Sequence, residues 1–181
     1  MRADAQRNVK EIRRAAIEAF REKGLTMPLA EVANHAGVSK GTIYHRFGGR
    51  SGLIDEVVDE LVAPRIEEII SAASSGTAWE RLELFLVNTW MLQFDDPVAR
   101  DVLSRRVPES KRLNALCDRA RTFSNTLLSA AQAEQSVSLD VTPEDLYYFV
   151  WANSAVLSNA PRQDRTEYIR RTRFWLNGIR P

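Results

Sequence analysis

Apolar residues recur every three to four positions along most of the chain, which is the spacing of one face of an α-helix. No stretch alternates apolar and polar residues in the manner of a half-buried strand. The pattern predicts an all-α protein of about nine helices, separated by glycine, proline, serine and threonine breaks. The expected helices cover about 7–23, 28–36, 39–47, 50–71, 78–94, 97–106, 109–135, 143–158 and 164–177.

Two prolines interrupt these expected helices. Pro64 predicts a kink or break inside the helix at 50–71, because proline lacks the N–H that an interior helical position needs. Asn159-Ala160-Pro161 is expected to end the helix at 143–158.

Residues 28–47 predict two short helices joined by a three-residue turn. Pro28 suits the first turn of a helix, and Gly37 can adopt the left-handed conformation that closes a helix end. Ser39 begins the next helix, because its hydroxyl can accept a hydrogen bond from the free N–H of Gly41 or Thr42. Two helices around a glycine-containing turn are the outline of a helix-turn-helix.

The second of these helices carries polar side chains opposite its apolar stripe of Ile43 and Phe47. Lys40, Thr42, Tyr44 and His45 offer a cation, a hydroxyl, a phenol and an imidazole, which can reach phosphate oxygens or base edges of DNA. Helical hairpins without a DNA-binding role also contain glycine turns, so the spacing alone leaves that simpler interpretation open.

The segment from Leu29 to Ile54 resembles the N-terminal domain of the tetracycline-repressor (TetR) family. The family pattern runs Ile-Ala-x-x-Ala-Gly-Val-Ser-x-Gly-Thr-Leu-Tyr-x-His-Phe and then Lys-x-x-Leu. It is matched here at Val32-Ala33, Ala36-Gly37-Val38-Ser39, Gly41-Thr42, Tyr44, Phe47 and Leu53. The chain departs from the pattern at three places, with Met27-Pro28 where a threonine cap is usual, Arg46 in place of histidine and Arg50 in place of lysine.

The resemblance implies a three-helix DNA-binding domain at residues 1–50 and a larger helical domain for effector binding and dimerisation at residues 51–181. It implies a one-component transcriptional regulator, a repressor, that binds palindromic double-stranded operator DNA as a homodimer and is released by a small-molecule effector. The expected DNA-binding residues are Ser39, Lys40, Thr42, Tyr44, His45 and Arg50.

Charge is distributed unevenly along the chain, although the net charge is only +1. Residues 1–50 hold ten Lys or Arg against five Asp or Glu, a net charge of +5, and residues 51–181 hold fifteen against nineteen, a net charge of −4. Since neutralising phosphates supplies much of the affinity for DNA, the basic end is the end expected to bind nucleic acid.

Composition narrows the remaining function classes. The chain is 44% hydrophobic and 27% charged, as is ordinary for a soluble globular protein. One cysteine, Cys117, excludes an internal disulfide, and two histidines are too few for a zinc site with it. No signal peptide or membrane-spanning run is evident, so a cytoplasmic protein is expected, with no metal or cofactor.

No sequence pattern for catalysis is present, since the chain lacks a glycine-rich phosphate loop and a nucleophile elbow. Asp95-Asp96 beside Pro97 is interpreted as a helix cap. Two alternatives stay open: a regulator of the same fold controlled by another protein or by no ligand, and an all-helical enzyme or carrier that keeps the helix-turn-helix only as a scaffold.

Aromatic residues in the second domain are ordinary core residues by their spacing, but the resemblance implies an effector cavity there. The candidate ligand-binding residues are Trp90, Phe94, Phe123, Tyr147 and Trp151, which favour an apolar or aromatic effector. Asn88, Asn125 and Asn153 lie within apolar helices and need hydrogen-bond partners, from the backbone or from a ligand.

Two predictions concern how the domains work together. The helices at 143–158 and 164–177 are expected to pair with a second copy as a four-helix bundle, with Tyr168, Thr172 and Trp175 as a stripe on the second helix. The helix that begins at Arg50 is expected to belong to both domains and to transmit the effector signal.

Overall fold

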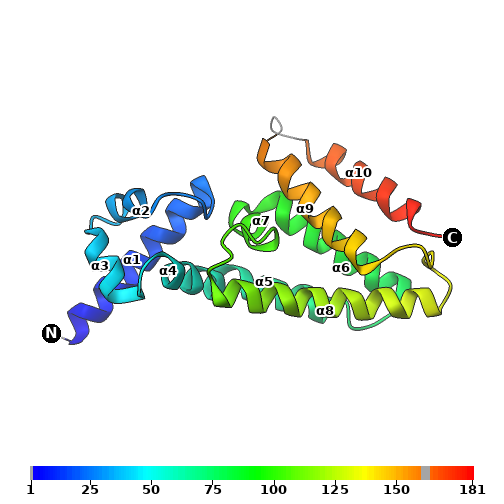
Figure 1. Ribbon diagram of the computed structural model, residues 1–181, viewed down its shortest axis with the longest axis horizontal. Helices are drawn as coiled ribbons and strands as arrows, with labels where there is room; N and C mark the ends of the chain where they lie inside the picture. Colours follow the sequence, from blue (N-terminus) through cyan, green and yellow to red (C-terminus); the bar gives the residue numbers. More distant parts are fainter. Residues whose placement is uncertain (1, 160–163) are drawn as a thin grey trace. The chain divides into compact units, whose positions relative to one another are not determined.

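The computed structural model describes residues 2–159 and 164–181, and Figure 1 shows their course. Over these residues every regular element is helical, as predicted. With α4, η1 and α5 counted as one continuous run, the described chain has nine helical stretches. The bounds are α1 Arg2–Lys23, α2 Leu29–His35, α3 Lys40–Phe47, α4 Arg50–Val57, η1 Val58–Val62, α5 Ala63–Ala72, α6 Ala78–Asp95, α7 Pro97–Leu103, α8 Lys111–Ala133, α9 Pro143–Asn159 and α10 Arg165–Gly178.

The chain forms two compact units, and each is made of two separate stretches of sequence. Unit 1 holds residues 1–64 and 96–116, and unit 2 holds residues 65–95 and 117–181. Unit 1 therefore extends beyond the predicted boundary at residue 50. It includes α7, which belongs to its second stretch of sequence.

The core of unit 1 is built from the apolar faces of α1, α2, α3 and α4. Phe20, Val32, Ile43 and Leu53 come from the four helices in turn, and each is fully buried. Figure 1 shows α2 and α3 beside α1 at the N-terminal end of the ribbon. Burying these side chains stabilises the fold by about 1.5–3 kcal/mol each, which holds the short helices in place.

The turn between α2 and α3 has the predicted chemistry. Gly37 adopts the left-handed conformation, with φ of 64°, and the Val38 N–H donates to the Ala33 carbonyl. Ser39 caps α3 by accepting a hydrogen bond from the Thr42 N–H at 3.1 Å. Pro28 differs slightly from the prediction, because it is the residue before α2 rather than its first helical residue.

The predicted interruption near Pro64 takes the form of a π-helical turn, η1. The Ala63 N–H donates to the carbonyl of Val58, five residues back, in place of the usual four. Pro64 has no N–H to continue the regular pattern, and the wider turn stands directly before it. The helical run from α4 to α5 stays continuous.

The core of unit 2 lies among α6, α8, α9 and α10. Trp90 on α6 is fully buried, and its ring meets those of Phe149 on α9 and Trp175 on α10 at centroid distances of 4.7 and 5.3 Å. The hydroxyl of Tyr168 on α10 donates to the Trp90 carbonyl at 3.0 Å. The sequence signal for the end of α9 falls partly outside the described residues, because Ala160 and Pro161 are not among them.

Candidate nucleic-acid interface and effector unit

Helix α3 presents its polar side chains to solvent. Ile43 is fully buried, while Lys40, Tyr44 and His45 are exposed and Thr42 is half-buried. Tyr44 has 60% of its surface exposed, which is high for a large aromatic residue. A cation, a phenol and an imidazole therefore lie on the outer side of a helix whose inner side is fixed in the core.

The hydroxyls of Ser39 and Thr42 lie 3.0 Å apart and share a hydrogen bond. Ser39 also accepts from the Thr42 N–H, which caps the start of the helix. A hydroxyl has one donor and two acceptor positions, so Thr42 retains capacity for a further contact.

A close approach between α3 and α4 fixes the angle of this surface. A Cβ on Gly52 would lie 1.8 Å from the carbonyl oxygen of Phe47, so no larger residue fits without moving one of the two helices. The first turn of α4 thus packs directly against the last residue of α3.

Arg50 begins α4, and the structure assigns its guanidinium a role within the protein. It donates to the carbonyl oxygens of Leu25 and Met27 in the segment between α1 and α2. Burial lowers the pKa of Arg50, although Glu109 acts in the opposite direction, and an arginine stays protonated at neutral pH. The phosphate contact expected of Arg50 would have to use its remaining donors.

Sequence reasoning missed a second residue that holds the same segment. Asp101 on α7 is buried, and its carboxylate accepts a hydrogen bond from the Leu25 N–H at 2.7 Å. Desolvation raises the pKa of Asp101, while the bond from Leu25 and the charges of Arg106 and Arg100 partly oppose this shift. The backbone of Leu25 is therefore held at its N–H by α7 and at its carbonyl by α4.

A further carboxylate connects α4 with the start of α8. Asp55 accepts from the Ser110 hydroxyl at 2.5 Å and from the Arg112 N–H at 3.1 Å, so it caps α8 from another helix. The sequence signal for Asp101 was an acid among the apolar residues of α7; Asp55 gave no comparable signal.

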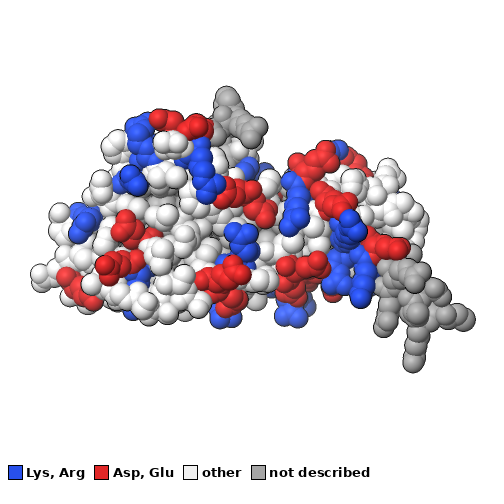
Figure 2. All heavy atoms as spheres, turned by 180° about the vertical axis from the view of Figure 1, so that it is seen from behind, with Lys and Arg blue, Asp and Glu red and all other residues white. Residues whose placement is uncertain are grey.

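Basic residues in unit 1 are partly paired with acids. Arg13 lies 3.3 Å from Glu56 and 3.4 Å from Glu60, and Lys23 lies 3.1 Å from Glu31. On the face that Figure 2 shows, positive and negative side chains are intermixed and do not gather into one basic patch. The charges of Arg13 and Lys23 are therefore already engaged by acids within the unit.

The aromatic residues proposed to line an effector cavity pack against different aromatic partners in unit 2. Trp90 packs with Phe149 and Trp175, as described above. The Phe94 ring packs against Tyr168, the Phe123 ring against Phe85 and the Tyr147 ring against Tyr148, with centroid distances of 4.8, 5.3 and 5.8 Å. Trp151 has 54% of its surface exposed. These contacts do not gather the five side chains around one space.

The prediction that Tyr168, Thr172 and Trp175 on α10 face a second copy of the chain is wrong. Tyr168 and Thr172 are 3% and 5% exposed, and Trp175 packs against Trp90 and Phe149, so all three face the core of their own unit. The period of the helix shows which residues share a face, but it does not show which neighbour covers that face.

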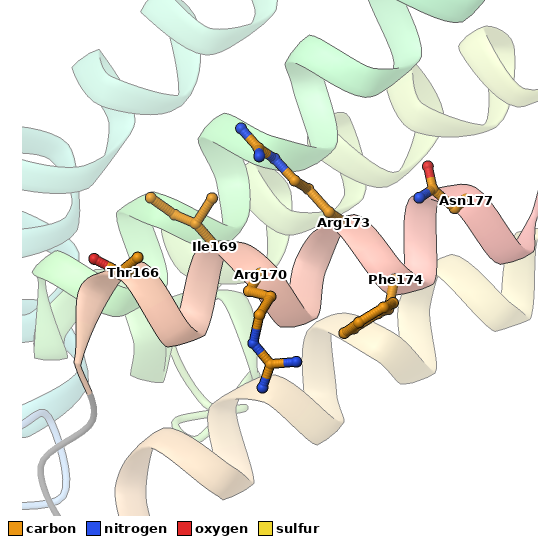
Figure 3. Close-up of a pocket in the computed structure, with 6 residues that line it drawn as sticks. All are labelled: Thr166, Ile169, Arg170, Arg173, Phe174 and Asn177. Carbon is orange, nitrogen blue, oxygen red and sulfur yellow. The ribbon is translucent and has the colours of Figure 1, made fainter.

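The outer face of α10 carries different residues. A recess of about 610 Å³ is lined by Thr166, Ile169, Arg170, Arg173, Phe174 and Asn177. Figure 3 shows Arg170 and Phe174 on one side of the helix and Ile169, Arg173 and Asn177 on the other. Arg170 lies 2.7 Å from Glu167 and stacks over the Phe174 ring at 5.4 Å, so its charge is already engaged.

Neither a metal centre nor a membrane span is found in the part of the chain that the structure describes. No three His, Cys, Asp or Glu side chains within 2–159 and 164–181 are placed to hold a metal ion together. None of the helices described there combines the length and apolar character needed to cross a bilayer.

This arrangement, two short helices joined by a glycine turn with the capped second helix exposed on a helical core, defines the class of helix-turn-helix proteins. Residues 12–57 match the family model of bacterial regulatory proteins, tetR family. The chain thus carries a TetR-family N-terminal domain, and the resemblance inferred from the sequence is confirmed. A comparison with curated proteins gives no match.

Solved structures of TetR-family members share the fold over nearly the whole chain. A member from Streptomyces coelicolor A3 is 23% identical, with a TM-score of 0.67, over 94% of this chain and 91% of that one. A TetR/AcrR-family regulator from Thermobifida fusca YX-ER1 is 24% identical, with a TM-score of 0.63, over 97% and 100%. The regulator FadR from Bacillus subtilis, solved in complex with stearoyl-CoA, is 18% identical, with a TM-score of 0.62, over 93% and 96%.

Proposed function

We propose that the protein is a transcriptional repressor of the TetR family that binds a palindromic operator through α3, acts as a homodimer in the cytoplasm and releases DNA when unit 2 binds a small molecule. The observation that carries the proposal is the outer face of α3, where Lys40, Tyr44 and His45 are exposed above a buried Ile43. The match of residues 12–57 to the family model supports the same interpretation.

The DNA contacts are divided by chemistry. Lys40 and Thr42 are proposed to contact base edges, whereas Ser39, Tyr44 and His45 contact phosphates and fix the position of the helix. Arg50 supports the surface mainly by holding Leu25 and Met27, so its replacement by alanine is expected to lower stability as well as DNA affinity.

The experiment begins with an operator selected from random duplexes by the full-length protein. Affinity is then measured across a salt series for the wild type, Lys40→Ala and His45→Ala. Lys111→Ala is the matched control, because it removes the same charge from an exposed residue of α8. Loss of a base contact costs about 1–3 kcal/mol, or roughly 5- to 150-fold in affinity. Equal affinity of Lys40→Ala and Lys111→Ala for the selected operator would refute the role of α3.

The homodimer is supported by exposed large hydrophobic side chains on α9 and α10. Seven large hydrophobic residues are exposed in the described chain, and four of them lie on these two helices: Tyr148, Trp151, Val156 and Phe174. Soluble monomers seldom leave such a patch uncovered, and a second copy would bury it by two-fold symmetry. Two α3 helices about 34–36 Å apart would then meet successive major grooves.

Val156→Arg tests this surface, because Val156 is 47% exposed on α9. Leu139→Arg is the control, since Leu139 is 81% exposed but lies between α8 and α9. In sedimentation velocity at micromolar concentration, the wild type and Leu139→Arg are expected to be dimers and Val156→Arg a monomer. A monomeric wild type, or a dimeric Val156→Arg protein, would contradict the proposed interface.

A further inference from the structure

Unit 2 contains buried polar side-chain atoms that make no hydrogen bond within the protein. They include Thr89 Oγ1, Trp90 Nε1, Asn125 Oδ1 and Asn153 Nδ2. Each such group destabilises the fold, because it has given up water without gaining a partner. Unpaired groups inside a folded core therefore call for a specific explanation.

Three of these groups come from facing turns of α6 and α9. The Trp90 ring lies 4.7 Å from the Phe149 ring, and the Gln93 side-chain N–H donates to the Val150 carbonyl and the Ser154 hydroxyl, both at 3.0 Å. Asn153 lies within this stretch of α9, one turn after Phe149. Thr89 lies one turn before Gln93 on α6, so it shares that helix face.

The chemistry of these groups restricts what could bind them. An indole N–H and an amide NH2 can only donate, so partners of Trp90 Nε1 and Asn153 Nδ2 must bring acceptor atoms, whereas the Thr89 hydroxyl can donate or accept. The ring contacts around Trp90 are to Phe149 and Trp175, which are apolar. A charged ligand group placed there would lose its hydration without gaining an opposite charge.

We propose that the effector of unit 2 is an uncharged, mainly apolar molecule whose carbonyl oxygen accepts a hydrogen bond from Trp90 Nε1, while Thr89 and Asn153 bind its remaining polar group. The inference rests on the proposed function, because it assumes that unit 2 binds a small molecule. It names the chemical class of that molecule and the atoms that would recognise it.

The first experiment observes the indole N–H signals of the four tryptophans in the full-length ¹⁵N-labelled protein by NMR, with the Trp90 signal assigned from a Trp90→Phe spectrum. Two matched series of probes are titrated: octan-2-one, octanoate and octane, and acetophenone, benzoate and toluene. We expect at least one ketone to shift the Trp90 signal and to bind roughly tenfold more tightly than its hydrocarbon. Tighter binding of the carboxylates, or an unmoved Trp90 signal with both ketones, would overturn the proposal.

The second experiment uses Thr89→Val, which removes a hydroxyl that has no partner and keeps the side-chain shape. We expect the ligand-free variant to melt about 2–4 °C higher than the wild type and to bind the active ketone roughly tenfold less tightly. Thr126→Val on α8 is the matched control and is expected to change neither, because the Thr126 hydroxyl is exposed and bonds to the Thr122 carbonyl. A lower melting temperature for Thr89→Val with unchanged ketone affinity would contradict the role of Thr89.

Operator binding without a probe separates this inference from the proposed function. We expect Thr89→Val to bind the selected operator as the wild type does. A wild type that binds operator but no ketone would refute the inference and leave the DNA-binding proposal intact. A wild type that binds a ketone through Trp90 but selects no operator would refute the DNA-binding proposal and leave the inference about the ligand intact.

Discussion

Replacing Gly52 by alanine is expected to destabilise unit 1, although the same change stabilises most helices. In an exposed helix interior the substitution gains about 1 kcal/mol, because alanine is the better helix former. Here the new Cβ would lie 1.8 Å from the Phe47 carbonyl oxygen, a backbone atom that cannot rotate away. Forcing an extra carbon into a packed contact costs about 1–3 kcal/mol, and this geometry belongs at the upper end. The net loss is about 2 kcal/mol.

A loss of that size corresponds to a melting temperature about 4–8 °C lower in a protein of this length. Circular dichroism follows the helices of both units, whereas all four tryptophans lie in unit 2, so their fluorescence follows that unit. We expect the shift in the dichroism transition and a matching loss of operator affinity, because α3 and α4 would have to move apart.

Gly178→Ala provides the control, because a Cβ on Gly178 at the end of α10 would meet nothing within 4 Å. Its melting temperature is expected to equal or slightly exceed that of the wild type. A Gly52→Ala protein that melts with the wild type or above it would refute the close contact between α3 and α4.

Three further predictions follow from hydrogen bonds in unit 1. Burial raises the pKa of Asp101, so its contribution to stability is full below the ordinary aspartate pKa of about 4 and is lost as the pH rises through its folded-state pKa. In urea unfolding, the free energy of unfolding of Asp101→Asn should therefore rise relative to that of the wild type from pH 4 to pH 7.5. A difference that stays constant over this range would contradict the prediction. Ser39→Ala should lose about 1 kcal/mol with the α3 cap, whereas Ser129→Ala, at an exposed position of α8, should not. Asp55→Ala leaves the Ser110 hydroxyl and the Arg112 N–H without their acceptor, so hydrogen exchange at the start of α8 should become faster, and unchanged protection there would count against this cap.

The helices could be predicted from the sequence because their signals are local. Gly37 and Ser39 act within a turn of their own positions, and the structure has the glycine conformation and the serine cap that their chemistry predicts. The partners of those helices could not be predicted in the same way. Asp101 meets Leu25 across 76 positions of sequence, and nothing near either residue indicates the other.

In the candidate site, too, local features could be predicted from the sequence and tertiary partners could not. The solvent-facing residues of α3 follow from helical period and one buried stripe, so the exposure of Lys40, Tyr44 and His45 was predictable. The use of Arg50 within the protein was not, because a guanidinium at a helix start suits a phosphate and a backbone carbonyl equally well. On α10, the period correctly grouped Tyr168, Thr172 and Trp175, but only the fold reveals that α6 and α9 cover them.

The division of unit 1 into residues 1–64 and 96–116 has a consequence for synthesis on the ribosome. The segment around Leu25 emerges early, but its partner Asp101 is made only after the intervening residues of unit 2. At about 5–20 residues per second, roughly 3–10 s pass between the addition of residue 64 and the addition of residue 116. During that interval the buried faces of α7 are missing, so a chain arrested after residue 64 should be digested by protease faster than one arrested beyond α8.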